Sequence, residues 1–363
     1  MTSNPATKGE PAPDTQLVTM GETMALLTHP LTTPLRHAQT LDLSVGGSES
    51  NVSIAAARLG VRTAWIGRVG SDEFGQIVLR ELHAEGVRTL SRQDAGRPTG
   101  LMVKARRTSQ SVQVTYYRAG SAGSALDTSD VDTDVLQEAD VFHTSAITVA
   151  VSASSAAAVS KRIEVCRASG TSVSIDLNFR RALWSEAATR EQFRHLASQA
   201  DMVFATETEA RIACGPAQAH DLAEELAGLG GGRAVIKLGE RGAVASIDGQ
   251  ICTVPPVPVL AVDSVGARVA FAAGYLAAVV HRLDTQTALH WAALMGAWSV
   301  ATHGDWQGLP AGQSSPPCRA MTTISSAVIS CPSGLGREGM SAMLVRAGHV
   351  GAGSEADQGQ GGD

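Results

Sequence analysis

Residues 261–280, AVDSVGARVAFAAGYLAAVV, constrain the fold of this chain more than any other segment. Val262 and Asp263 predict the end of a strand, and the turn at 264–266 contains a glycine. An apolar helix is expected next, with its buried side formed by Ala270, Phe271, Ala273, Gly274, Leu276, Ala277 and Val280. A helix that begins directly after a turn presents backbone N–H groups and the positive end of its dipole. The segment therefore predicts an anion-binding site within an α/β fold.

Short apolar segments alternate with helical periods along the rest of the chain, which predicts an α/β architecture. Strands are expected at 17–22 (with its glycine turn), 63–67, 139–144, 173–177, 200–204, 234–238, 243–247 and 250–254, and helices at 48–59, 152–167 and 287–301. Three further segments, 41–45, 98–104 and 111–117, are expected to form a small β-sheet that covers the pocket as a lid.

Charge and cysteine usage exclude several classes of protein. The 363 residues carry a net charge of -6 without a Lys/Arg-rich block, which argues against a nucleic-acid surface. The five cysteines are scattered and odd in number, so neither a metal site nor a disulfide framework is expected. Residues 1–16 lack a signal-peptide profile, and the apolar stretch 270–280 is too short to span a bilayer. We therefore expect no membrane association and a cytoplasmic location.

Three motifs resemble those of one enzyme family. Residues 46–51, GGSESN, combine two glycines that permit close backbone approach with Asn51, which can both donate and accept hydrogen bonds. Together with DSVGARVAF at 263–271 and GRVGSDEFG at 67–75, this motif resembles the PfkB (ribokinase-like) carbohydrate kinases. The resemblance implies a three-layer α/β/α fold with a mostly parallel central sheet and a small β-lid.

Two further segments narrow the resemblance to the 2-keto-3-deoxygluconate kinases. They are YYRAGSA at 116–122 and DLNFRRALW at 176–184. The resemblance implies that Tyr117, Arg118 and Arg180 hold the sugar acid, and the guanidinium fork suits a carboxylate because it donates two parallel hydrogen bonds. From residue type alone, an exposed arginine beside a packing tyrosine is the alternative for Arg118.

The resemblance also implies an activity and its binding residues. The family transfers the γ-phosphoryl group of ATP to a sugar hydroxyl with Mg²⁺, and family lids often meet across a homodimer. Substrate-binding positions would be Glu22, Gly46, Gly47, Asn51, Tyr117, Arg118, Asp176 and Arg180. Nucleotide-binding positions would be Lys237, Gly239, Gly242, Asp263 and Val265. Glu209 would help to organise the Mg²⁺–phosphate network, although a carboxylate in a first helical turn is also favoured by the helix dipole.

The anion-hole turn, formed by Gly266, Ala267, Arg268 and Val269, departs from the family pattern D-[ST]-x-G-A-G-D-A-F. Arg268 replaces a glycine, and Val269 replaces the aspartate that would accept the proton of the sugar hydroxyl. If the backbone at 268 requires φ > 0, Arg268 would be strained by about 1 kcal/mol or more, and its side chain would crowd the phosphates.

This departure leaves the activity of the chain open. The chain is either an active or impaired sugar-acid kinase, or a non-catalytic sugar- or nucleotide-binding protein on the same scaffold. A kinase for a neutral sugar is a third alternative. Local reading-frame damage would also account for Arg268 and Val269.

The resemblance covers residues 17–310, which we interpret as one kinase domain. Residues 1–16 have no apolar period and predict a disordered extension. Residues 311–363 are rich in Ser, Gly, Pro and Gln and predict a poorly ordered tail, where the family would usually end in a helix.

Overall fold

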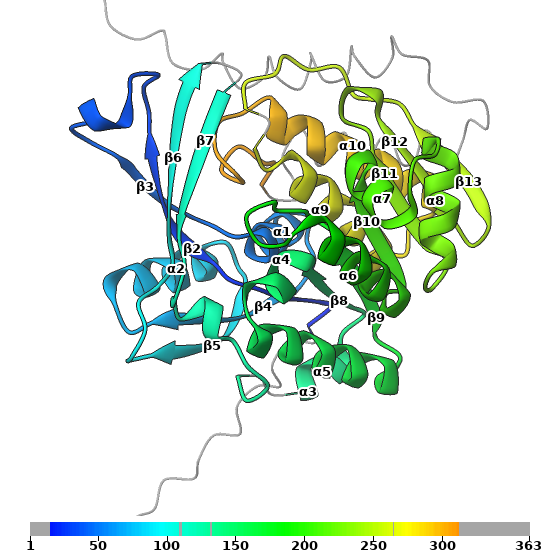
Figure 1. Cartoon of the computed structure of the whole chain (residues 1–363), viewed down its shortest axis with the longest axis horizontal. Helices are drawn as coiled ribbons and strands as arrows, with labels where there is room; N and C mark the ends of the chain where they lie inside the picture. Colours follow the sequence, from blue (N-terminus) through cyan, green and yellow to red (C-terminus); the bar gives the residue numbers. More distant parts are fainter. Residues whose placement is uncertain (1–14, 109–110, 131–132, 264, 312–363) are drawn as a thin grey trace, which may run out of the picture.

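A computed structural model of the chain describes residues 15–108, 111–130, 133–263 and 265–311. The predicted extension and tail lie almost entirely outside these residues. The centre of the fold is a nine-stranded sheet with the order β13-β12-β11-β10-β9-β8-β1-β4-β5 (Figure 1). Its strands are β1 (Leu17–Met20), β4 (Thr63–Gly70), β5 (Arg88–Asp94), β8 (Val141–Ser145), β9 (Ser172–Asp176), β10 (Met202–Thr206), β11 (Arg233–Lys237), β12 (Ala243–Ile247) and β13 (Gln250–Val254). The pairings from β5 to β11 are parallel, and β12 and β13 are antiparallel additions at one edge.

Helices cover both faces of this sheet because its strands are apolar on both sides. In β1, Leu17 packs into one core, whereas Val18 and Met20 pack into the other. The first core contains α1 (Ser48–Arg58), α2 (Glu73–Ala84), α9 (Ala267–Val280) and α10 (Thr285–Val300). The second contains α3 (Asp134–Glu138), α4 (Ala146–Val151), α5 (Ala153–Ser169), α6 (Glu186–Gln199), α7 (Glu207–Cys214) and α8 (Ala219–Gly228). The predicted three-layer α/β/α fold is therefore confirmed.

A separate four-stranded sheet, with the order β3-β2-β6-β7, projects from one side of the molecule (Figure 1). We call it the lid. It consists of β2 (Met24–His29), β3 (Asp42–Gly46), β6 (Leu101–Thr108) and β7 (Ser111–Tyr117). The prediction omitted β2, which pairs with β3 and β6 and joins the lid directly to β1. It also began the second lid segment three residues before β6.

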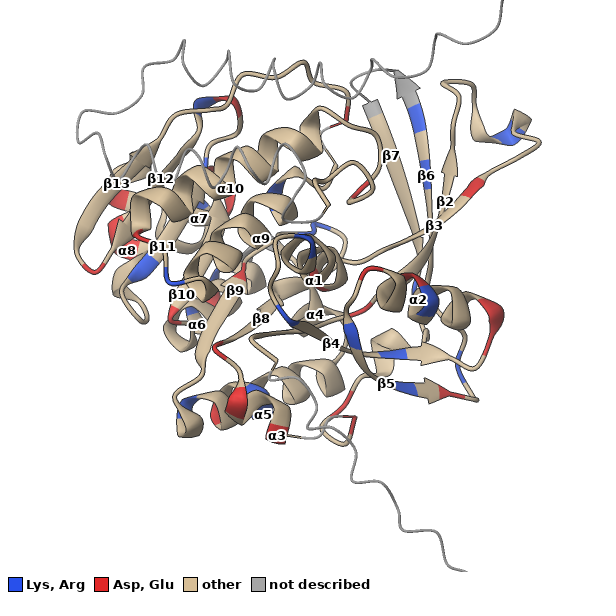
Figure 2. Ribbon diagram, turned by 180° about the vertical axis from the view of Figure 1, so that it is seen from behind, with Lys and Arg blue, Asp and Glu red and all other residues tan. Residues whose placement is uncertain are grey.

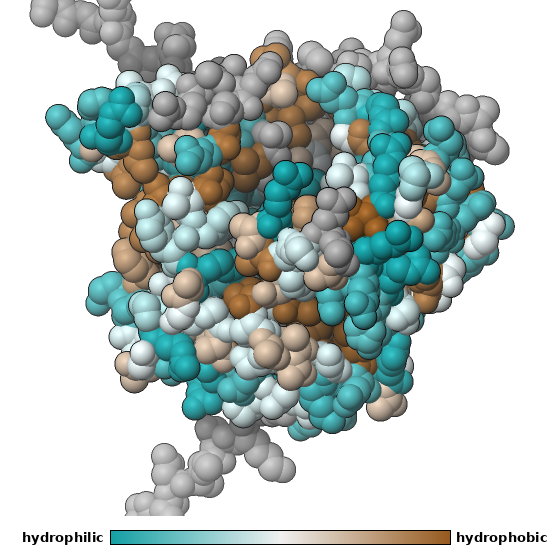
Figure 3. All heavy atoms as spheres, in the orientation of Figure 1, coloured by the Kyte–Doolittle hydropathy of each residue, from teal (hydrophilic) through white to brown (hydrophobic). Residues whose placement is uncertain are grey.

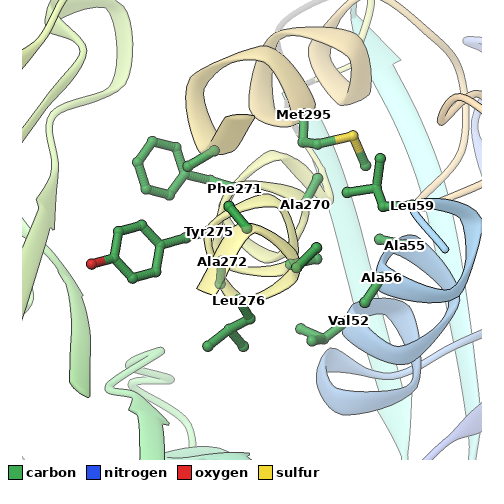
Figure 4. Packing of buried hydrophobic residues seen from close by; sticks show 14 of the residues in the cluster. Val52, Ala55, Ala56, Leu59, Ala270, Phe271, Ala272, Tyr275, Leu276 and Met295 are labelled. Carbon is green, nitrogen blue, oxygen red and sulfur yellow. The ribbon is translucent and has the colours of Figure 1, made fainter. Parts of the chain in front are cut away.

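Helix α9 lies between α1 and α10, as Figure 4 shows, with Val52 of α1, Leu59 at the end of α1 and Met295 of α10 directed toward it. The helices approach closely because α9 is rich in small residues. A Cβ atom at Gly274 would lie 2.7 Å from the carbonyl oxygen of Trp291 in α10. This packing fixes the position of the turn at the start of α9.

The chain before α9 differs from the prediction, because Val262 and Asp263 do not belong to a strand. Their N–H groups instead donate to the carbonyl of Val300 at 2.8 and 3.1 Å, at the end of α10. That carbonyl is one of the last in its helix, so it has no intrahelical donor. No helix in the described part of the chain is long and apolar enough to cross a bilayer.

Candidate active site

The turn before α9 is built around Gly266, which has φ 89° and is the N-cap of the helix. A Cβ atom at this position would lie 2.5 Å from the backbone carbonyl oxygen of Asp305. Glycine is therefore required both by the left-handed backbone and by the close approach. The carboxylate of Asp263 accepts a hydrogen bond from the N–H of Val265 at 3.1 Å and braces the turn from the preceding side.

A pocket of about 490 Å³ opens between the lid and the body of the molecule. Its volume is typical of a site for a small molecule. Figure 3 shows apolar residues over the lid, beside a hollow that separates it from the body. The pocket is lined by Glu22, Met24, Leu26, Gly47, Ser48, Glu49, Asn51, Met102, Lys104, Val114, Tyr116, Arg118, Ala119, Ile147, Asn178, Arg180, Arg181, Ala182, Leu183, Val265, Gly266, Val269 and Asp305.

Some of the predicted site residues share this pocket and others do not. The lining includes Glu22, Gly47, Asn51, Arg118, Arg180, Val265, Gly266 and Val269. It does not include Gly46, Tyr117, Asp176, Glu209, Lys237, Gly239, Gly242, Asp263, Ala267 or Arg268. The roles expected for these residues remain predictions.

The two glycines at the end of β3 allow the lid to meet the body closely. A Cβ atom at Gly47 would lie 2.5 Å from the carbonyl oxygen of Glu22, and one at Gly46 would lie 2.5 Å from the side chain of Met102. The N–H of Gly47 also donates to the side chain of Asn51 at 3.4 Å. The start of α1 is thus held against the floor of the pocket.

Arg118 lines the pocket and is paired there with the carboxylate of Glu22. Its guanidinium donates to the carboxylate of Glu22 at 2.5 and 2.8 Å, and the hydroxyl of Ser121 donates to the other oxygen at 2.5 Å. Tyr117 is 62% exposed and lies outside the lining, whereas Tyr116 lines the pocket. Adjacent side chains of a strand point to opposite faces, so only one of the two tyrosines can face the pocket.

The segment after β9 carries the second arginine. Asn178 adopts φ 32°, and its amide donates to the hydroxyl of Ser48 at 2.9 Å, which joins β9 to α1. Arg180 donates to the carbonyl of Phe179, and no ion pair among the described residues involves Arg180 or Arg181.

Asp176 and Lys237 form a buried ion pair at 2.8 Å, at the ends of β9 and β11. Gly239 and Gly242, which follow Lys237, have φ of 63° and 85°. A Cβ atom at Gly242 would lie 2.1 Å from the carbonyl oxygen of Val254, so this glycine is required by the packing of the turn. The charge of Lys237 is compensated in this structure by Asp176.

Glu209 belongs to a capping box at the start of α7 with Thr206. Its carboxylate accepts from the N–H groups of Thr206 at 2.7 Å and Phe179 at 2.8 Å, and the guanidinium of Arg268 lies 3.5 Å away. Arg268 is not among the described residues with positive φ, and its side chain is 48% exposed. The expected backbone strain at Arg268 is therefore wrong, because the left-handed residue of this turn is Gly266.

Sequence reasoning missed four charged residues of the pocket: Glu49, Lys104, Arg181 and Asp305. Burial raises the pKa of Glu49, although the hydroxyls of Ser145 and Thr148 donate to its carboxyl at 2.5 and 3.0 Å and oppose the rise. The ammonium group of Lys104 lies 2.9 Å from the carboxylate of Asp263 and 3.2 Å from that of Asp305.

Lys104 has a neighbour of the same charge, Arg106, which lies 3.0 Å from Asp263. Figure 2 shows these basic residues along β6 in blue. The only sequence signal for this cluster was the spacing of two residues, which places both basic side chains on one face of a strand.

Comparison with known proteins identifies the family of this chain. Residues 14–311 match the pfkB family carbohydrate kinases. The chain belongs to this family of carbohydrate kinases. It is 34% identical over 302 residues to the 2-dehydro-3-deoxygluconokinase of Bacillus subtilis (strain 168), covering 81% of this chain and 92% of the relative. It is 32% identical over 299 residues to the corresponding enzyme of Thermoproteus tenax, covering 81% and 91%.

Solved structures of other proteins have the same fold as this chain. The PfkB protein from Polaromonas sp. JS666 matches with a TM-score of 0.75 and 33% identity, covering 82% of this chain and 97% of the other. A putative ribokinase II from E. coli, in complex with ATP and Mg²⁺, has the same fold with a TM-score of 0.78 at 21% identity, covering 86% and 99%. ATP with Mg²⁺ is thus found on this fold.

Proposed function

We propose that this carbohydrate kinase phosphorylates a sugar acid, with 2-keto-3-deoxygluconate (2-dehydro-3-deoxygluconate) as its substrate. The observation that carries the proposal is the charge of the pocket. Glu22 compensates Arg118 and Asp305 is paired with Lys104, while Arg180 and Arg181 have no ion-pair partner among the described residues. Two uncompensated guanidinium groups favour an anionic ligand. The names of the relatives quoted above support the same substrate.

Each group in the pocket can be given a role from its chemistry. Arg180 would bind the carboxylate of the sugar acid through two parallel hydrogen bonds. Arg118, held by Glu22, would add positive charge on the lid side. The backbone of Gly47 and the side chain of Asn51 would contact sugar hydroxyls, because glycine admits a ligand close to the main chain.

The residues around the turn fit ATP. The N–H groups of Ala267 and Arg268, at the start of the 14-residue helix α9, have no intrahelical acceptor and form the positive end of the helix dipole, which suits migrating phosphoryl oxygens. The N–H of Val269 donates to the carbonyl of Gly266 at 3.0 Å. Lys237, Gly239, Gly242, Asp263 and Val265 are the proposed nucleotide-binding residues.

No cluster of three or more potential metal ligands occurs among the described residues, so Mg²⁺ would be held mainly by the phosphates. When bound, Mg²⁺ neutralises charge on the transferring phosphoryl group. Glu209 is the proposed residue that organises this region, through the contacts that it makes with the start of α7.

The rate of phosphoryl transfer that we expect depends on the residue at position 269, which is Val269. It lines the pocket in the first turn of α9 but has no atom that accepts a proton. Loss of a general base typically lowers the rate by ~10²–10⁴. We therefore expect binding of the sugar acid, with slower ATP turnover than an aspartate at position 269 would give. A protein that binds the sugar acid without turnover, or a kinase for a neutral sugar, is the alternative outcome.

The substrate class is tested with Arg180→Ala and a matched neutral sugar, 3-deoxyfructose, in which a hydroxymethyl group replaces the carboxylate. A hydrogen bond to a charged group contributes about 1.5–3 kcal/mol, so the Kd of 2-keto-3-deoxygluconate should rise by roughly 10–150-fold. The Kd of 3-deoxyfructose should change by less than about threefold, because that sugar cannot form the ion pair.

The matched control is Arg190→Ala, at an exposed position of α6 that does not line the pocket. Calorimetry of all three proteins with both sugars separates charge recognition from general damage. An equal loss of affinity for both sugars in Arg180→Ala would count against a carboxylate-binding role.

We also propose a homodimer formed through the lid. Large apolar side chains are exposed on or beside it: Leu31 is 61%, Leu43 47% and Tyr117 62% exposed. A second copy of the lid would bury these residues. Sedimentation equilibrium tests the proposal, since Leu43→Ser should shift the protein toward a monomer and a monomeric unmodified protein would exclude the dimer.

The cytoplasm remains the predicted compartment, supported by the free thiols of Cys166, Cys214 and Cys252.

A further inference from the structure

Asp305 lies in the pocket on a segment that is firmly held. The guanidinium of Arg58 donates to the carbonyls of Trp306 at 2.9 Å and Leu309 at 2.7 Å. The indole N–H of Trp306 donates to the carbonyl of Val45 at 3.0 Å, at the end of β3. These contacts fix the main chain on the C-terminal side of Asp305, so its carboxylate has a defined position in the pocket.

The position of Asp305 relates the two parts of the site. Its carbonyl oxygen lies 2.5 Å from the Cβ position of Gly266 in the anion-hole turn. Its carboxylate oxygen Oδ2 lies 3.2 Å from the Cβ position of Gly46, at the start of the GGSESN motif. Lys104 holds the other oxygen, Oδ1, at 3.2 Å. Asp305 therefore lies between the anion-hole turn, which its main chain contacts, and the proposed sugar-binding motif, which its carboxylate contacts.

The other carboxyl groups that line the described pocket are Glu22 and Glu49, and both are engaged otherwise. Glu22 is bound by the guanidinium of Arg118 and by Ser121. Glu49 is 2% exposed and accepts hydrogen bonds from Ser145 and Thr148. Among these three lining carboxyl residues, Asp305 is the one whose main chain contacts the anion-hole turn, since its carbonyl oxygen lies 2.5 Å from the Cβ position of Gly266.

We propose that Asp305 accepts the proton of the attacking sugar hydroxyl, the role that Val269 cannot perform. This inference rests on the proposed kinase function. In the step, the hydroxyl O–H bond breaks and its proton moves to the carboxylate of Asp305. The sugar oxygen forms a bond to the γ-phosphorus of ATP, while the bond from that phosphorus to the β,γ-bridging oxygen breaks. The electron pair of that bond leaves with ADP, and the proton on Asp305 is then released to solvent.

Lys104 is a positioning residue in this proposal. Its ammonium group is shared between Asp305 and Asp263, so it orients the carboxylate of Asp305 through Oδ1 and leaves Oδ2 directed toward Gly46. The same ion pair joins β6 of the lid to the segment before the turn.

The test compares four proteins, with ATP and 2-keto-3-deoxygluconate as substrates. They are the unmodified chain, the single variants Asp305→Asn and Asp305→Glu, and a double variant that carries both Val269→Asp and Asp305→Asn. Asp305→Asn should lower kcat by ~10²–10⁴ and abolish the acid limb of the pH–rate profile, while the Kd of the sugar acid changes by less than about threefold. Asp305→Glu should retain that limb. Adding Val269→Asp to Asp305→Asn should restore part of kcat, which an unfolded protein could not show.

The matched control is Asp248→Asn, an exposed turn residue paired with Arg233 outside the pocket, which should leave kcat and the pH profile unchanged. If Asp305→Asn keeps both kcat and the acid limb, or if Val269→Asp restores nothing in its background, the inference is overturned while the kinase function stands. If the unmodified chain transfers no phosphoryl group to any sugar acid, the proposed function fails and this inference fails with it.

Discussion

Gly266→Ala is the substitution that tests the anion-hole turn most sharply. At φ 89° a residue with a Cβ atom costs about 1–2 kcal/mol relative to glycine. The new Cβ atom would also lie 2.5 Å from the backbone carbonyl oxygen of Asp305, and overpacking of this kind costs about 1–3 kcal/mol. We therefore expect the free energy of unfolding to fall by about 2–5 kcal/mol, with a loss of kcat because the turn must shift.

Gly170→Ala provides the matched control, because Gly170 has φ 82° but no heavy atom within 4 Å of its Cβ position. It should lose only the backbone contribution, about 1–2 kcal/mol, and retain kcat. Urea unfolding measures both variants, provided that their m values agree with that of the unmodified protein. Equal losses at the two glycines would refute the claim that Asp305 is packed against the turn.

Further substitutions test three other parts of the account. Gly274→Ala should destabilise the protein by about 1–2 kcal/mol because its Cβ atom would meet the main chain of α10. Gly228→Ala, whose Cβ atom would have no neighbour within 4 Å, should stabilise α8 by up to about 1 kcal/mol. Thermal unfolding of the two variants distinguishes these outcomes. Burial raises the pKa of Glu49 above its usual 4.5, so the native state binds the proton more tightly and stability falls as the pH rises above that value. Glu49→Gln should remove this fall, as urea titrations at pH 5 and pH 8 would reveal, and an unchanged pH dependence would contradict it. Val269→Asp should raise kcat, which steady-state kinetics would measure. Adding Arg268→Gly should relieve no backbone strain and should lower helix stability by about 1 kcal/mol, which thermal unfolding would measure.

Several features of the fold follow directly from local sequence. Alternation of short apolar strands with helical periods predicted the α/β architecture, and the family resemblance implied its three layers. The glycine turn before α9 was predicted at the position where the structure has it, and its role in anion binding stays a prediction. The strand β2 was missed because it follows β1 after only three residues, and the prediction ended the first strand at the glycine turn and assigned no structure to residues 24–29. The predicted strand at Val262 and Asp263 was wrong because these residues cap the end of α10, a long-range contact without a local signal.

The candidate site was harder to predict than the fold. The sequence indicates both arginines, but it cannot show that Glu22 pairs with Arg118 while Arg180 has no such partner among the described residues. Asp305 is separated from Lys104 by 201 positions, so their contact exists only in the folded chain. Asp305 lies within the region of resemblance, but a sequence match does not indicate which carboxylate could accept the proton that Val269 cannot accept.

The central claim is that this pocket phosphorylates a sugar acid. The most direct measurement is steady-state ADP release by the unmodified chain with ATP and Mg²⁺, in the presence of either 2-keto-3-deoxygluconate or 3-deoxyfructose. We expect ADP release that depends on the sugar acid, with a kcat/KM at least about tenfold higher than for 3-deoxyfructose, as one charged hydrogen bond provides. Equal kcat/KM values for the two sugars, or binding of the sugar acid without ADP release, would contradict the claim.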